Sequence, residues 1–148
     1  MIAFFSHHFY LLLLLFAPVV VLGSALQSRI SGWAALASRF PATDIPEGEQ
    51  FRFVSGSVGA AFPSSYRGIL FVTVSATGFA LSIFLPFRFC APNLFIPWSQ
   101  VEAVTEKPAF LYTLAEIHIR GSRTRISLFG ASARSILQAY APYATNAR

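Results

Sequence analysis

Three arginines near the carboxyl end carry the side chains best suited to bind an anion. Arg123 and Arg125 are separated by one residue, so both project from the same face if residues 123–129 form a strand. Arg120 lies across a predicted tight turn from them. Converging guanidinium groups can hold phosphate oxygens through paired hydrogen bonds. We therefore predict a site for anionic lipid headgroups at Arg120, Arg123 and Arg125; the alternative is that they only keep an edge hairpin soluble.

Aromatic side chains gather around a proline-bounded loop at residues 86–93. We predict that they form a docking surface for a partner protein. Its residues are Phe87, Phe89, Phe95 and Trp98, with Phe84 beside them. Such aromatics otherwise pack into a core or contact a bilayer, and the sequence leaves both alternatives open.

The ionisable residues show no pattern typical of an enzyme. Proton-transfer catalysis needs paired groups with separated pKa values, and no spacing pairs any two of the 6 acids. Cys90 with His118 could form a nucleophile and base, but only their presence supports this. His7 and His8 are adjacent and would point about 100° apart on a helix, a poor arrangement for one metal ion. We predict no catalytic residue, metal or cofactor.

An uncharged run over residues 9–26 sets the compartment of the rest of the chain. As an α-helix it would span about 27 Å, close to the hydrocarbon thickness of a bilayer. It predicts a retained transmembrane anchor over residues 1–28, with a cleaved signal peptide and a buried core helix as alternatives. Small residues near Ala25 suit a cleavage site, but no Lys or Arg precedes Arg29, and signal peptides usually have a basic amino end.

The arginines after this run predict its orientation. Arg29 and Arg39 follow it closely, and basic residues concentrate on the cytoplasmic flank of a span. Abundant Ala and the use of Arg in place of Lys indicate a bacterial genome rich in GC. We therefore expect a single-pass protein of the inner membrane with a cytoplasmic carboxyl-terminal domain; the alternative is export after cleavage near Ala25.

Composition limits the rest of the chain to one apolar, basic domain. The chain of 148 residues is 55% hydrophobic and 11% charged, with a net charge of +5. Without the anchor, the remainder has the size of one ordinary domain. The charge favours anionic surfaces. A nucleic-acid partner is not expected, because the chain has a predicted tether and no binding fingerprint.

Residues 29–50 predict a short amphipathic helix and a linker. Trp33, Leu36, Ala37 and Phe40 recur at helical spacing within residues 31–40. This face could lie in the membrane interface or pack on the domain. Two prolines, a glycine and half of the acids then mark residues 41–50 as a linker.

From residue 51 the hydrophobic period changes to two, which is typical of strands. The pattern predicts a turn at residues 106–108 and a loop at 61–68. It also predicts a final helix over 132–140 that stops at Pro142. Seven strands are expected, at residues 51–58, 69–75, 79–85, 94–98, 99–105, 110–119 and 123–129.

Two segments carry a resemblance to a known family. Residues 94–104, LFIPWSQVEAV, resemble the (L/F)-x-I-P-W/L-S-x-(I/V) segment of GRAM-like and bacterial pleckstrin-homology (PH)-like domains. Residues 68–81 resemble the strand, turn and G-L-x-L strand of those domains. The resemblance covers about residues 51–141. It implies a partly open antiparallel β-barrel, capped by a carboxyl-terminal helix, that binds lipids or proteins. Only Arg52 and Arg67 stand in the first hairpin, so phosphoinositide binding is not carried over.

The sequence thus predicts a mainly β fold with domain bounds 1–28, 29–50 and 51–148. The preferred function is a non-enzymatic, membrane-anchored PH-like adaptor that binds a partner protein or anionic lipid headgroups at the cytoplasmic face. The alternative is an exported small β-barrel domain that holds an apolar or lipid ligand. The anchor and short helix also resemble bacterial membrane proteins of uncharacterised function, which adds no function.

Overall fold

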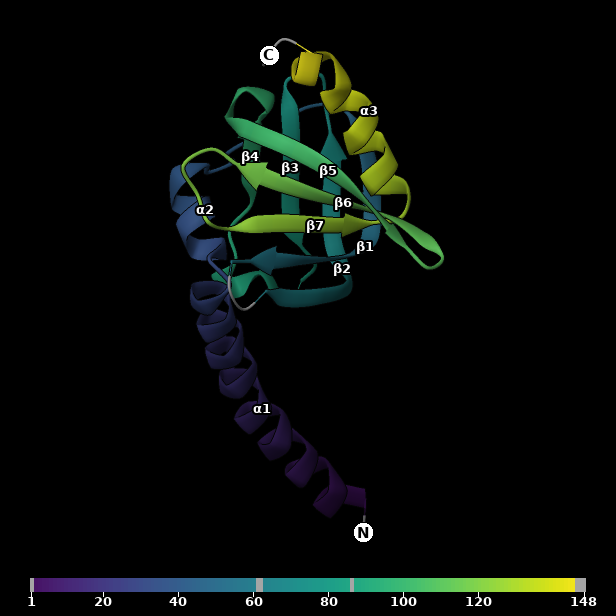
Figure 1. Cartoon of the computed structure of the whole chain (residues 1–148). Helices are drawn as coiled ribbons and strands as arrows, with labels where there is room; N and C mark the ends of the chain where they lie inside the picture. The colour runs from purple at the N-terminus through teal and green to yellow at the C-terminus, as the bar shows by residue number, and fades with distance from the viewer. Residues whose placement is uncertain (1, 61–62, 86, 146–148) are drawn as a thin grey trace.

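The computed structural model describes residues 2–60, 63–85 and 87–145. A long helix, α1 (Ile2–Ile30), leads into a short helix, α2 (Trp33–Arg39), and then into a β-rich domain that ends with helix α3 (Ala131–Thr145). Figure 1 shows α1 leaving the domain at one end, while α3 ends on the opposite side. The expected mainly β class is confirmed.

The strands form one antiparallel sheet of seven strands, in the order β4-β3-β2-β1-β7-β6-β5. The sheet curls into a half-barrel with β4 and β5 at its edges (Figure 1). Short 3₁₀ turns, η1 (Phe87–Cys90) and η2 (Trp98–Gln100), precede β4 and β5. The strands are β1 (Glu49–Gly59), β2 (Ser64–Val74), β3 (Gly78–Ile83), β4 (Leu94–Pro97), β5 (Val101–Ala109), β6 (Tyr112–Ile119) and β7 (Arg125–Phe129).

Alternation along the strands fills the interior of the half-barrel. In β6 and β7, Ala115, Ile117, Ile126 and Leu128 are buried, while the residues between them face outward. All six residues of β3 are buried. The large side chains that are almost fully enclosed include Trp33, Trp98, Phe79, Leu70 and Leu94.

Both short helices cover this core. Trp33, Leu36 and Ala37 of α2 are buried with Phe40, so the amphipathic face packs on the domain. On the other side, α3 buries Ala133, Ile136 and Tyr140. The α3 helix continues through Pro142 to Thr145, so the predicted stop at Pro142 is wrong. A proline inside a helix loses one hydrogen bond and crowds the carbonyl four residues earlier, but only three residues of α3 follow Pro142.

Two other predicted boundaries are wrong. Strand β5 runs through Pro108 to Ala109, and the turn lies at residues 110–111 instead of 106–108. Proline is acceptable there because β5 is an edge strand. Strand β2 begins at Ser64, inside the predicted loop 61–68; residues 61–62 lie outside the described residues.

The α1 helix is long and apolar enough to span a membrane. Its stretch Tyr10–Ile30 has 21 residues and a mean hydropathy of 2.1. The carboxyl-terminal end of α1 contacts the domain: Ser28 is buried, and just after the helix the Ser31 hydroxyl lies 3.5 Å from the Tyr66 hydroxyl of β2. The leucines at positions 11, 12, 14, 15 and 22 are more than half exposed, which is not the packing of a core helix.

Candidate functional site

A bulge in β1 turns two consecutive side chains outward. Its pairing with β2 shifts between Phe51 and Val54. At the shift, Phe53 has a φ of 57°, the left-handed region that side chains other than glycine rarely adopt. Phe51 packs against the core and Val54 is buried. Consequently Arg52 and Phe53 both face solvent, which a regular alternation would not allow.

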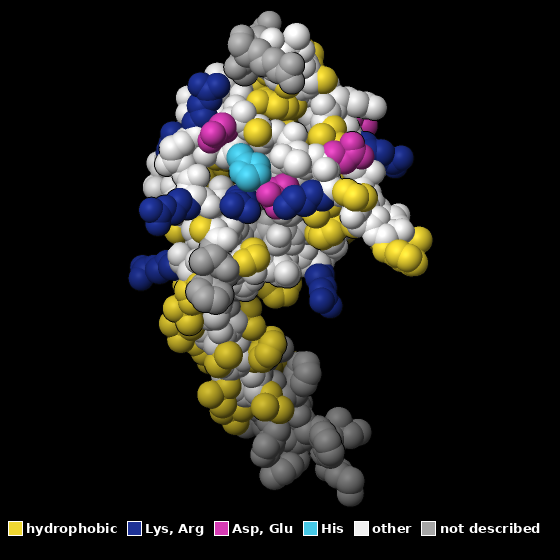
Figure 2. All heavy atoms as spheres, in the orientation of Figure 1, with side chains coloured by type: hydrophobic (Ala, Val, Ile, Leu, Met, Phe, Trp, Pro, Cys, Tyr) yellow, Lys and Arg dark blue, Asp and Glu magenta, His cyan; other side chains and the backbone are white. Residues whose placement is uncertain are grey.

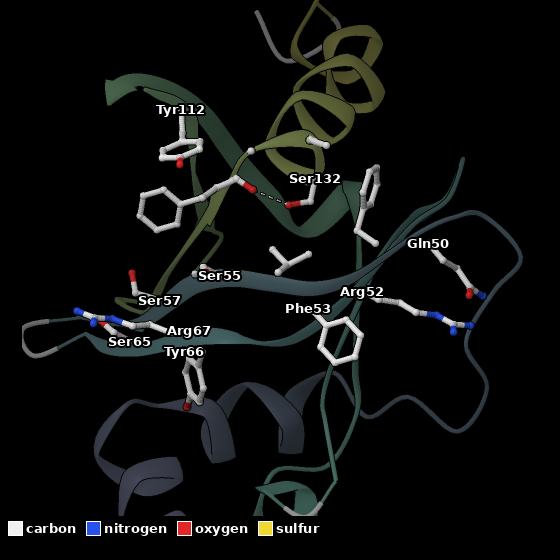
Figure 3. Close-up of a pocket in the computed structure, with 16 residues that line it drawn as sticks. Gln50, Arg52, Phe53, Ser55, Ser57, Ser65, Tyr66, Arg67, Tyr112 and Ser132 are labelled. Atoms are coloured by element: carbon white, nitrogen blue, oxygen red, sulfur yellow. Dashed lines mark hydrogen bonds between the residues drawn. The ribbon is translucent and has the colours of Figure 1, made fainter. Parts of the chain in front are cut away.

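An open groove of about 910 Å³ follows this bulge and is called the β1 groove here. One wall is the β1–β2 hairpin, and the other is the end of β7, the first turn of α3 and Tyr112 of β6. Figure 3 shows Arg52 and Arg67 pointing toward opposite ends of the groove, with Phe53 between them. Hydroxyl groups line its floor, contributed by Ser55, Ser57 and Ser65.

The charge of the β1 groove is uniformly positive among its described lining residues. Arg52 and Arg67 are exposed, and none of the described residues that line the groove is Asp or Glu. The structure shows no ion pair to either arginine within the described residues. Two arginine side chains beside hydroxyl donors form a surface suited to phosphate or carboxylate oxygens.

The β1 groove begins beside the end of α1. Tyr66 lines it, and the Tyr66 hydroxyl is the group within 3.5 Å of Ser31. The Tyr66 ring also packs on Trp33, with ring centroids 5.7 Å apart. Burial raises the pKa of Tyr66 above its ordinary value, so the hydroxyl stays neutral near pH 7. This contact places the groove next to the point where α1 leaves the domain.

The predicted arginine site is only partly gathered on one strand. Strand β7 begins at Arg125, so Arg120 and Arg123 lie in the turn before it. All three side chains are exposed. The turn lies beside the Arg39 guanidinium of α2. Arg125 has a carboxylate neighbour, because its guanidinium is 3.7 Å from Glu116.

Glu116 organises the outer face of β5, β6 and β7. Its carboxylate accepts a hydrogen bond from Lys107 at 2.8 Å and lies 3.0 Å from the His118 ring. The hydrogen bond from Lys107 holds the pKa of Glu116 below its usual value. Figure 2 shows a His side chain and acidic side chains among Lys and Arg side chains on one face of the domain. Because Arg125 lies 3.7 Å from this carboxylate, part of its charge is neutralised, and it is less available to an outside anion than Arg120 or Arg123.

The predicted partner surface needs a correction. Trp98 is 2% exposed and donates a hydrogen bond from its indole N–H to the Ser75 carbonyl at 3.1 Å, so it belongs to the core. Phe95 is half-buried, whereas Phe87 and Phe84 are exposed. The side chains of Phe89 and Cys90 lie outside the described ones, so the structure does not address Phe89 or a Cys90–His118 pair.

A different aromatic group reaches the surface. The rings of Phe53, Phe71 and Phe84 pack on one another with centroid distances of 5.5 to 5.9 Å. We call these three residues the aromatic cluster. Sequence reasoning included only Phe84 of the three. Residues 51–54 carried no signal for the bulge that exposes Phe53.

The described residues contain no group of three or more His, Cys, Asp or Glu that could hold a metal ion. Comparison with known proteins adds no assignment: no protein-family model matches the chain, and no curated protein matches it.

Proposed function

We propose that the chain is a non-enzymatic, membrane-anchored binding module with a PH-like domain, and that its β1 groove binds anionic lipid headgroups. The observation that carries the proposal is a groove with two exposed arginines and no acidic lining residue, beside the end of a helix apolar enough to span a membrane. In this arrangement α1 holds the groove near lipid phosphates at all times.

The expected strength of the interaction is modest. Each arginine near a bilayer surface contributes about 1 kcal/mol with anionic lipid. Arg52 and Arg67 together therefore favour anionic over neutral lipid by about 30-fold. A permanent anchor makes such a weak preference sufficient, because the headgroup concentration beside the groove is always high.

We place the domain on the cytoplasmic side of a bacterial inner membrane. Arg29 and Arg39 flank α1 on the domain side, which is the side that basic residues favour. Export with an apolar ligand inside the barrel has less support, because Trp33, Trp98, Phe79 and other large side chains occupy the interior. Reporter fusions at the carboxyl terminus, one active only in the cytoplasm and one only after export, test the orientation.

Lipid retention tests the headgroup proposal. The full-length chain is placed in nanodiscs of mixed neutral and anionic lipid, and native mass spectrometry counts the lipids that stay bound. The double variant Arg52→Gln/Arg67→Gln should lose most of its anionic lipid.

The matched control is Arg120→Gln/Arg123→Gln, which removes the same charge from the β6–β7 turn. It should keep its anionic lipid. Equal loss in both variants would mean that total charge, and not the β1 groove, attracts the lipid. Loss in the control alone would assign the site to the turn.

A partner protein is the second candidate. Within the described residues β5 pairs with β6 alone, and Tyr140 of α3 bonds the Glu102 carbonyl near its start. The rest of such a sheet edge can accept a strand from another protein. Site-specific cross-linking from Thr105, an exposed residue of β5, would reveal a protein adduct if this edge is used.

A further inference from the structure

Large apolar side chains outside α1 are exposed in two places near the β1 groove. The first is the aromatic cluster, where Phe53 is 61% exposed and Phe84 is 41% exposed, and Leu85 and Phe87 continue it. The second is the turn between β5 and β6, where Phe110 is fully exposed and Leu111 and Tyr112 are more than half exposed. We call residues 110–112 the hairpin tip. Isolated exposed apolar residues are ordinary, but adjoining groups of them mark a contact surface.

The aromatic cluster is continuous with the docked end of α1. Phe84 directly follows β3, and η1, which begins three residues later, contacts α1. Arg88 within η1 and Arg29 at the end of α1 are both exposed. The rings therefore lie beside the place where a bilayer spanned by α1 would begin, with basic side chains at the same level.

The hairpin tip lies on the opposite rim of the β1 groove. Tyr112 and Phe53 both line that groove, so one apolar group stands on each side of it. Figure 1 shows the β5–β6 hairpin projecting from the half of the domain that α1 leaves, away from the end of α3. In Figure 2, hydrophobic side chains cover the coloured part of α1 and the end of this hairpin, with a basic side chain between them.

The chemistry of both groups fits a lipid surface better than a protein. Their exposed side chains are Phe, Leu and Tyr, which insert readily at the boundary of headgroups and acyl chains. Arg52, Arg67 and Arg88 are at their margins. Glu106 and Lys107 are the charged residues of β5 nearest the tip and together add no net charge; Glu102 and Glu116 lie farther along the hairpin, and Glu116 is paired with Lys107. A basic margin around apolar tips complements an anionic bilayer.

We propose that the aromatic cluster and the hairpin tip both contact the bilayer, one on each side of the β1 groove, so that the groove opens onto the headgroups. This inference rests on the proposed function in one respect, because it takes α1 to span the membrane. The domain is then held against the bilayer at three places, which are α1, the aromatic cluster and the hairpin tip, instead of being attached through α1 alone. The left-handed backbone conformation of Phe53 then serves this contact, because the bulge turns the ring out toward lipid.

Spin labels on the full-length chain in liposomes with anionic lipid test this geometry. Single cysteines replace Leu85 or Leu111 in a Cys90→Ser background, and each label is exposed to oxygen, which enters the bilayer, or to a water-soluble nickel chelate. Labels at Leu85 and Leu111 should favour collision with oxygen and lose most collisions with nickel. A label at Gln138, an exposed position on α3, should show the reverse. Thermal unfolding of each labelled chain checks that the domain stays folded.

A label at Leu22 in α1 separates the two proposals. If Leu22 is in lipid while Leu85 and Leu111 collide with nickel as often as Gln138, the bilayer contact is wrong and the anchor stands. If Leu22 also meets nickel freely, the anchor itself is wrong. Protection of Leu85 or Leu111 from both reagents would indicate a protein against that surface and would overturn the lipid contact as well.

Discussion

Two sets of aromatic residues in this protein have opposite surroundings. The interior set, Trp33, Trp98 and Tyr140, is buried, and each member donates a hydrogen bond to a backbone carbonyl. The exterior set, the aromatic cluster, consists of phenylalanines that have no polar atom to satisfy. Residues with both an apolar body and a donor are useful in a core when the donor finds a partner. A phenylalanine ring has no such donor, so when it faces outward it is suited to contact the apolar part of a bilayer.

This contrast assigns the two sets different roles: the interior set stabilises the fold, and the aromatic cluster contacts the membrane. Changes to the interior set should lower the free energy of unfolding, whereas changes to the aromatic cluster should alter only the contact with lipid. The predictions below test that separation, beginning with the largest expected effect.

Replacing Trp98 by alanine should cost about 3–5 kcal/mol of unfolding free energy, because a large ring leaves the core and a cavity remains. Trp98 packs against Phe79 and Tyr140, with ring centroids 5.5 and 6.1 Å away. Denaturant unfolding of the full-length chain in detergent measures the loss. A cost below that of an ordinary surface substitution would show that Trp98 is not the core residue described.

Removing the Tyr140 hydroxyl should have a smaller effect. Tyr140 is 7% exposed and donates to the Glu102 carbonyl at 3.0 Å. The Tyr140→Phe variant should lose about 1 kcal/mol, since a partly buried hydrogen bond is removed. Tyr143→Phe is the matched control: its hydroxyl donates to Ala76 at 2.8 Å, but the residue is 40% exposed. Water can replace that bond, so equal losses in the two variants would contradict the account.

The charged residues on the outer face of the sheet should contribute less to the free energy of unfolding, and their contribution should depend on pH. Because the pKa of Glu116 is lowered in the folded chain, its ionised form stabilises the fold above the ordinary pKa of a carboxyl group. That contribution is lost as the pH falls through the lowered value. The stability gap between the wild type and Glu116→Gln should be about 0.2–1 kcal/mol at neutral pH and should close in acid. A gap that widens in acid would reverse the assigned sign.

Exchanging Phe53 for asparagine should change stability least. Asparagine adopts the left-handed conformation more readily than phenylalanine, which offsets the loss of partly exposed ring packing. We expect an unfolding free energy within about 0.5 kcal/mol of the wild type, as for an ordinary surface substitution. A loss of unfolding free energy comparable to that of Trp98→Ala would show that Phe53 stabilises the core like the interior set, and would contradict the distinction between the two sets.

Much of the fold could be predicted from the sequence because local patterns agree with it. Alternation over residues 69–75 and 79–85 predicted the β2–β3 hairpin, and the helical spacing of Trp33, Leu36 and Phe40 predicted α2. These patterns are strong since each element buries one face against a single core. The turn after β5 was misplaced because Pro108 normally ends a strand, and the position of β5 at a sheet edge makes proline acceptable there.

The candidate site was harder to predict, since it depends on register and on one irregular residue. Arg52 and Arg67 border the same groove because β1 pairs with β2 through Gly56 and Tyr66, and the sequence alone does not give that pairing. The bulge at Phe53 has no sequence signal. Trp98 was misplaced because the sequence puts it at the end of a predicted strand, 94–98, beside the proline-bounded loop, whereas the ring is buried at the start of η2.

The central claim is that the β1 groove and its rims contact lipid. The most direct measurement places the photo-cross-linker p-benzoylphenylalanine at Tyr112, which lines the groove and is 64% exposed. The full-length chain is irradiated in the membrane of the cells that express it, and the intact mass of the product is measured. We predict an added mass of one phospholipid. An adduct the size of a protein would contradict the account and identify the partner that occupies this surface instead.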